Sequence, residues 1–153
     1  MEVFDEFMEV VRAVRKNCPW DKVQTHESLK PYLVNETNEL LEGIDRLKNE
    51  NDSENLCEEL GDVLFQVALH SVIAQEEGLF TIEDVVSGIS SKMQFRHPKI
   101  FSPEDKEAVK LTWDELKKRK KNKDRKHAEH GADTRFLAQK TLTIHRKRYI
   151  NRR

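Results

Sequence analysis

The chain has 153 residues, of which 36% are charged and 37% hydrophobic, and its formal net charge is −1. This length suits one compact domain, and no apolar run approaches the roughly 20 residues that cross a bilayer, which excludes a transmembrane protein. Five glycines and four prolines are too few for an all-β protein, which is rich in tight turns.

Two helices are predicted in the first third of the chain. Residues 2–16 place apolar side chains at helical spacing, and Pro19 ends this helix because proline disfavours helix in the residue before it. A second helix is expected to begin after a cap at Thr25 or Ser28 and to run to about Lys48.

Three more helices follow. The third is predicted over about 53–77, where Gly78 is a natural stop. A fourth helix, over about 81–95, begins with a capping-box pattern in which Asp84 follows Thr81 by three residues. A short basic helix is expected over about 112–123. The predicted fold class is therefore all-α, a helical bundle with two long central helices and shorter flanking helices.

Charge is distributed unevenly along the chain. Residues 1–116 carry 12 basic and 25 acidic residues, whereas residues 117–153 carry 15 basic and 3 acidic residues. We predict a domain over 1–122 and a basic C-terminal extension over 123–153 that is poorly ordered. A basic tail on an acidic body also fits contact between the tail and nucleic acid.

Four carboxylates on the two central helices are candidate metal ligands. Glu36 and Glu39 are three residues apart on the second helix, and Glu59 and Asp62 are three apart on the third. Residues at this spacing share a helix face, so all four carboxylates converge if the helices pack antiparallel. Such a group requires a cation, and its oxygen ligands suit Mg²⁺ or Mn²⁺. The alternative is ordinary solvated carboxylates in an acidic chain.

Two further pairs have the spacing of one helical turn. Lys92 and Arg96 end the fourth helix, where they can bind an anionic group of a ligand or simply complement the helix C-terminus. Trp113 and Lys117 lie on the last helix, and Trp113 can either stack on a base or anchor its helix in the core.

The chain resembles the MazG family of nucleoside triphosphate pyrophosphohydrolases over residues 1 to about 120. The resemblance is carried by the blocks CPWDKVQTHESLKPYL, ETNELLE, EELGDVLFQVALHSVIAQEEGLFTIEDV and KMQFRHPKIF, in that order. It implies an all-α bundle that assembles as a dimer or a dimer of dimers. It also implies Mg²⁺-dependent hydrolysis of nucleoside triphosphates to monophosphate and pyrophosphate.

The resemblance also assigns roles to individual residues. The family's metal motif falls on Glu36, Glu39, Glu59 and Asp62, and Glu36 or Glu39 is the carboxylate expected to orient or deprotonate the attacking water. This chain departs from the motif at its first position, where Asn35 replaces a glutamate.

The nucleotide contacts implied by the resemblance lie in other blocks. The matching lysine and arginine are Lys92 and Arg96, which contact the triphosphate, and Trp113 and Lys117 contact the nucleotide. The CPWD block places Trp20 and Asp21 in the pocket wall, although Trp20 fits a core position equally well.

A non-catalytic helical adaptor is the alternative function. Its acidic face would be solvated, and its basic tail would bind nucleic acid or an acidic partner. In the main interpretation we expect a nucleoside triphosphate as substrate, a homodimer or homotetramer, and no membrane or nucleic-acid partner. A cytoplasmic location is expected because Cys18 and Cys57 form no CxxC pair and no zinc spacing.

Overall fold

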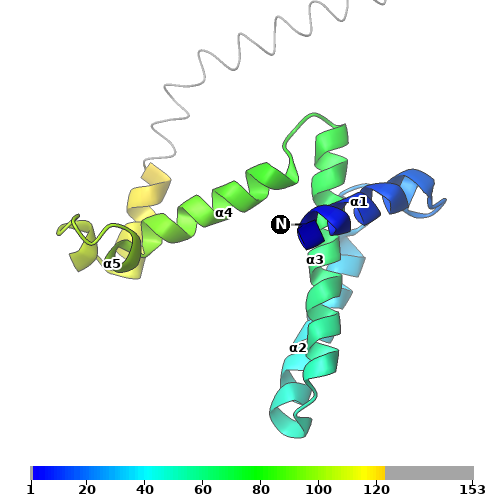
Figure 1. Ribbon diagram of the computed structural model, residues 1–153, viewed down its shortest axis with the longest axis horizontal. Helices are drawn as coiled ribbons and strands as arrows, with labels where there is room; N and C mark the ends of the chain where they lie inside the picture. The colour runs from blue at the N-terminus through cyan, green and yellow to red at the C-terminus, as the bar shows by residue number, and fades with distance from the viewer. Residues whose placement is uncertain (1, 123–153) are drawn as a thin grey trace, which may run out of the picture. The chain divides into compact units, whose positions relative to one another are not determined.

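The structure, a computed structural model, describes residues 2–122, and every regular element in that range is helical (Figure 1). The prediction for 123–153 lies outside these residues. The chain divides into two compact units within α4 (Ile82–Arg96): one is Met1–Ser87, and the other begins at Gly88. None of the helices in the described range has the length and apolar character needed to cross a membrane.

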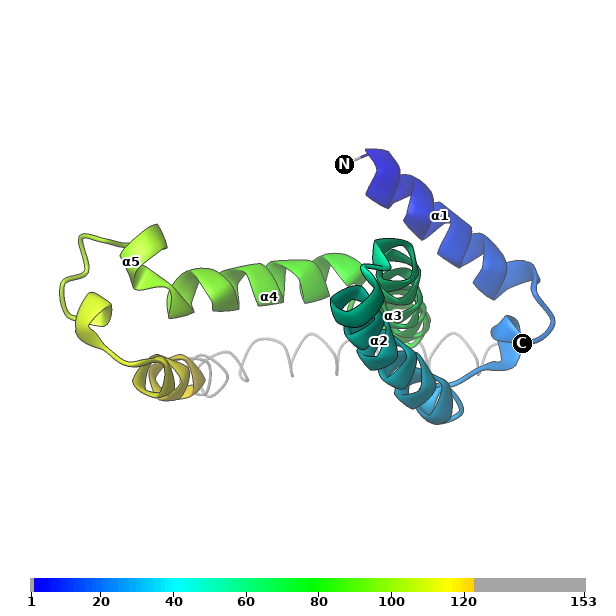
Figure 2. The same cartoon turned by 90° about the horizontal axis from the view of Figure 1, so that it is seen from below.

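The first unit is organised around two long antiparallel helices. These are α2 (Lys30–Glu50) and α3 (Ser53–Glu76), which pack side by side, while α1 (Glu2–Asn17) packs across α3 (Figures 1 and 2). The two long central helices expected from the sequence are therefore confirmed. A short 3₁₀ helix, Asp21–Val23, lies in the connection between α1 and α2.

The α2–α3 hairpin is closed by a short polar turn. Asn51 takes a left-handed conformation, with φ 57°, and ends α2. Asp52 caps α3 by accepting a hydrogen bond from the Asn55 amide at 3.1 Å, and its other oxygen accepts one from Arg46 Nη2 at 2.6 Å. The end of α2 is thereby tied to the start of α3.

The core of the first unit lies where the second half of α3 meets α1. The apolar stripe of α1 contributes Met8 and Val11, and Leu29 is fully buried just before α2. The hairpin extends away from this core, and the first half of α3 is therefore less buried than the second half. The α3 and α4 members of the core are Ala68, Leu69, Val72, Ile73 and Ile82.

The predicted cap of α2 is wrong. Thr25 and Ser28 instead cap each other: each backbone amide donates to the other's hydroxyl, at 2.9 and 3.1 Å. This turn directs Leu29 into the core, and α2 begins only at Lys30 with no side-chain cap. The missing N–H of Pro31 needs no partner in the first turn of the helix.

The capping box predicted for α4 is confirmed, because Asp84 accepts from the backbone amide of Thr81 at 2.9 Å. After α4, the segment expected as a polar loop contains two short helical pieces, α5 (Pro98–Phe101) and a 3₁₀ helix, Ala108–Lys110. The last described helix spans 113–122.

Arg15 joins α1 to the rest of the first unit. Its Nη2 donates to Glu76 Oε2 at 2.8 Å, and its Nη1 donates to the carbonyl oxygens of Asp21 and Gln24. The Arg15 side chain is 11% exposed and that of Glu76 is 50% exposed, so solvent screens the ion pair more than it screens the bonds to the two backbone carbonyls.

We expect Arg15→Ala to lower the free energy of unfolding by about 1.5–3 kcal/mol, the usual range for hydrogen bonds to a charged group. Arg15→Lys should recover only part of this loss, because an ammonium cannot reproduce the forked geometry. Urea denaturation measures both. The exposed Arg12→Ala on the same helix is the control, and an equal effect there would contradict the assigned role.

Candidate functional site

Three carboxylates from the two central helices meet on one side of the hairpin. Glu36 comes from α2, and Glu59 and Asp62 come from α3. Each offers one oxygen, and these oxygens all lie within 4.8 Å of one another. Glu36 and Glu59 are partly buried and Asp62 is exposed, so the group is open to a ligand on one side.

The electrostatics of this group favour a bound cation. The pKa of Glu36 is raised, first by burial and then by the negative charges of Glu39, Asp62 and Glu59. A hydrogen bond with Glu39 also favours the protonated form. Carboxylate oxygens at this spacing fit a hard divalent cation such as Mg²⁺ or Mn²⁺, which would neutralise the repulsion.

The fourth expected ligand, Glu39, lies beside this group. Its carboxylate neighbours Glu36 and accepts a hydrogen bond from Asn35 Nδ2 at 2.7 Å. Asn35 therefore supplies a donor at the position where the family motif has a glutamate. The structure brings three of the four predicted carboxylates into one close group and leaves Glu39 at its edge.

Two residues that the sequence analysis did not single out also contact the group. Asn55 Nδ2 donates to Glu59 Oε1 at 2.9 Å. Gly43 is the buried residue of α2, and a Cβ atom placed on it would lie 3.2 Å from Asn55 Oδ1. The sequence contains a signal for each of these residues. Asn55 lies one helical turn before Glu59, and Gly43 is a glycine inside a predicted helix.

Trp20 and Asp21 lie in the first unit, between α1 and α2. Trp20 is 45% exposed and packs edge-on against Tyr32, with ring centroids 5.1 Å apart. It therefore does not fill the core. Asp21 is buried, and its backbone carbonyl is one of the acceptors of Arg15.

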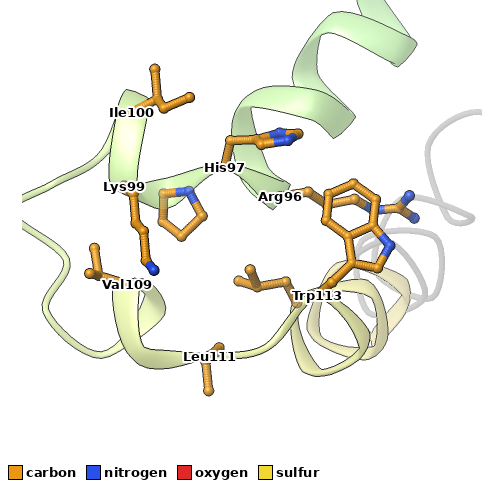
Figure 3. A pocket seen from close by; sticks show the side chains of 9 residues that line it. Arg96, His97, Lys99, Ile100, Val109, Leu111 and Trp113 are labelled. Carbon is orange, nitrogen blue, oxygen red and sulfur yellow. The ribbon is translucent and has the colours of Figure 1, made fainter.

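The second unit contains a cavity of about 300 Å³ with a mainly apolar lining that also includes two basic residues, Arg96 and Lys99 (Figure 3). The guanidinium of Arg96 lies 5.3 Å from the centre of the Trp113 ring, and His97 meets the same ring edge-on. A flat aromatic ligand that carries negative charge suits such a surface. The lining residues are Arg96, His97, Pro98, Lys99, Ile100, Val109, Leu111, Trp113 and Leu116.

The other predicted nucleotide contacts lie next to this cavity in sequence but do not line it. Lys92 is partly buried one turn before Arg96, and Lys117 is exposed one turn after Trp113. Arg96 Nε is buried without a hydrogen-bond partner in the described part of the chain.

Comparison with known proteins identifies relatives. A family model described as the MazG nucleotide pyrophosphohydrolase domain matches residues 24–101. The chain is 43% identical over 123 residues to the nucleoside triphosphate pyrophosphohydrolase/pyrophosphatase MazG of Thermotoga maritima, covering 79% of this chain and 46% of that protein. It is 36% identical over 134 residues to the nucleoside triphosphate pyrophosphohydrolase of Escherichia coli K12, covering 84% and 49%.

Two other matches define the extent of the similarity. The uncharacterized protein YabN of Bacillus subtilis is 48% identical over 124 residues, which cover 78% of this chain and 24% of YabN. The crystal structure of a mazG-related protein from Thermotoga maritima aligns with a TM-score of 0.59 at 30% identity, over 74% of this chain and 98% of that one. The chain thus spans from about a quarter to about half of the length of these curated relatives.

The raised pKa of Glu36 predicts how its removal changes stability. Ionised Glu36 costs the metal-free fold free energy, and this cost is present above the folded-state pKa and is lost as the pH falls below the pKa of the unfolded chain. Glu36→Gln should therefore stabilise the metal-free chain near pH 7–8, by a few tenths of a kcal/mol for each like-charge contact relieved.

Urea denaturation in EDTA at pH 8 and at pH 4 measures this difference. The stabilisation should shrink strongly at the lower pH, where wild-type Glu36 is mostly protonated in both states. A variant that is equally or less stable than wild type at pH 8 would contradict the assigned repulsion.

Proposed function

The chain belongs to the MazG family, and on that premise we propose that it hydrolyses nucleoside triphosphates to nucleoside monophosphate and pyrophosphate with Mg²⁺ or Mn²⁺. The observation that supports this proposal is the clustering of three carboxylates, those of Glu36, Glu59 and Asp62. The names of the relatives from Thermotoga maritima and Escherichia coli support the substrate class.

In the proposed reaction, Glu36, Glu59 and Asp62 hold the cation, and Glu39 completes the acidic face. When bound, the cation screens the phosphate charge and makes a water easier to deprotonate. Glu36 or Glu39 orients the water that attacks the α-phosphorus and accepts its proton. The bond from the α-phosphorus to the bridging oxygen breaks, and pyrophosphate leaves.

The second unit is proposed to bind the nucleotide. Lys92, Arg96 and Lys117 supply positive charge for the triphosphate. The indole of Trp113 offers a face on which a base can stack. Trp20 and Asp21, in the first unit, are proposed as further nucleotide-binding residues, as the family resemblance implies.

We assign the catalytic domain to residues 1–122, because every proposed site residue lies within them. The adaptor alternative depends on the basic extension over 123–153, which lies outside the described residues. We place the reaction in the cytoplasm, where nucleoside triphosphates are found and thiols such as those of Cys18 and Cys57 stay reduced.

We also propose that the chain assembles as a homodimer or homotetramer through the hairpin. Both helices carry large apolar side chains that water reaches, which is unusual for a surface with no partner. On α2 they include Leu41 and Ile44, which are 56% and 48% exposed. On α3 they include Leu60, Leu64 and Val67, which are 53%, 44% and 39% exposed. A second copy would cover both stripes.

Light scattering after size exclusion should therefore give at least twice the mass of one chain at micromolar concentration. Leu64→Glu should shift the protein toward monomer, because it buries a charge in the proposed interface. The matched change Val3→Glu, on the exposed start of α1, should leave the mass unchanged. A monomeric wild type would contradict the proposal.

Pyrophosphate release from mixed nucleoside triphosphates tests the function itself. EDTA should abolish it, and Glu59→Gln and Asp62→Asn should each lower turnover by at least about 10–100-fold, the cost of losing even an outer partner of a metal site. Glu58→Gln removes the same charge from an exposed position of α3 and should leave turnover near wild type. Wild-type hydrolysis in both Glu59→Gln and Asp62→Asn would rule out the assigned ligands.

A further inference from the structure

Among the three clustered carboxylates of Glu36, Glu59 and Asp62, that of Glu59 accepts a hydrogen bond from a neutral side chain. The Nδ2 atom of Asn55, one helical turn earlier on α3, donates to Glu59 Oε1 at 2.9 Å, and both side chains are partly buried. A carboxylate has about four acceptor sites, so one such bond fixes its orientation and leaves sites free for a cation. A neutral amide does this without competing with the cation for charge.

Gly43 on α2 forms the wall against which this pair packs. A Cβ atom on Gly43 would lie 3.2 Å from Asn55 Oδ1, 3.3 Å from Glu59 Cγ and 3.5 Å from Leu56 Cα. Any side chain here would therefore displace the two groups that form the hydrogen bond. Glycine inside a helix usually costs stability relative to alanine, and this close approach explains its place in α2.

The backbone of Asn55 is also anchored. Its amide donates to the capping carboxylate of Asp52 at 3.1 Å, and Arg46 of α2 donates to the same carboxylate at 2.6 Å. The donor to Glu59 therefore begins from a fixed point in the first turn of α3. By contrast, the corresponding donor on α2, Asn35, is exposed.

We propose that Asn55 and Gly43 are positioning residues for the cation site. Asn55 orients the carboxylate of Glu59, and Gly43 lets α2 close on the pair so that Glu59 meets Glu36 from the facing helix. The inference rests on the proposed function, because it assigns the two residues to the affinity of the same cation site.

The experiment measures Mn²⁺ binding to the full chain without nucleotide, from the electron paramagnetic resonance signal of free Mn²⁺. Asn55→Ala and Gly43→Ala should each raise the dissociation constant about 10–100-fold. Two controls should bind like wild type: Asn49→Ala, an exposed asparagine of the same hairpin, and Gly88→Ala, where a Cβ meets nothing within 4 Å.

Two further readouts separate positioning from general structural damage. Gly43→Ala should resist urea as well as wild type, because alanine favours helix, even though it binds Mn²⁺ more weakly. Pyrophosphate release by Gly43→Ala should recover most of its turnover when Mn²⁺ is raised above the new dissociation constant. Loss of activity that high Mn²⁺ does not restore would overturn the positioning role.

Failure of this inference is distinguishable from failure of the proposed function. Wild type that binds Mn²⁺ and releases pyrophosphate, with Asn55→Ala and Gly43→Ala binding equally tightly, overturns the positioning role alone. Wild type with neither saturable Mn²⁺ binding nor pyrophosphate release overturns the proposed function, and the positioning role with it.

Discussion

Repulsion between carboxylates across the α2–α3 interface is the constraint on which the rest of the first unit depends. Glu36, Glu59 and Asp62 are held close together, and the pKa of Glu36 is raised first by its burial and then by the like charges beside it, which together are a cost to the fold. That cost is met by packing elsewhere: the second half of α3 is buried against α1, and the hairpin carrying the carboxylates extends from this anchored part. A site that stores repulsion gains affinity for a divalent cation.

Contacts near the turn of the hairpin determine how closely α2 and α3 approach each other. Arg46 and Asp52 tie the two helices together next to the turn, and Gly43 lets them approach where Asn55 and Glu59 lie. Arg46, Asp52, Gly43 and Asn55 are not themselves proposed ligands. Their effect is to fix the distance between the helices, which decides whether carboxylates from both can bind one ion.

The spacing of apolar residues and the residues that begin and end helices made much of the fold predictable from the sequence. Gly78 and the pair Thr81 and Asp84 are strong local signals, and the structure has them where expected. The cap of α2 was not predictable in the same way, because Thr25 and Ser28 satisfy each other in a preceding turn. Local patterns name good capping residues but not which amide each will bind.

The site was predictable where its residues share a helix face and less so where it depends on contact between helices. The spacing of Glu59 and Asp62 indicated a common face, and the structure joins them to Glu36. The roles of Asn55 and Gly43 depend on how closely α2 approaches α3, which no single-helix pattern reports. The cavity beside Trp113 likewise depends on how short helical pieces fold back within the second unit.

The most direct test of the central claim is to locate the cation on the chain by amide NMR with substoichiometric Mn²⁺. Paramagnetic broadening should begin in two stretches that are distant in sequence, around Glu36 on α2 and over 59–62 on α3, and EDTA should reverse it. Broadening confined to one helix, or centred on another acidic segment, would contradict a site built from both helices.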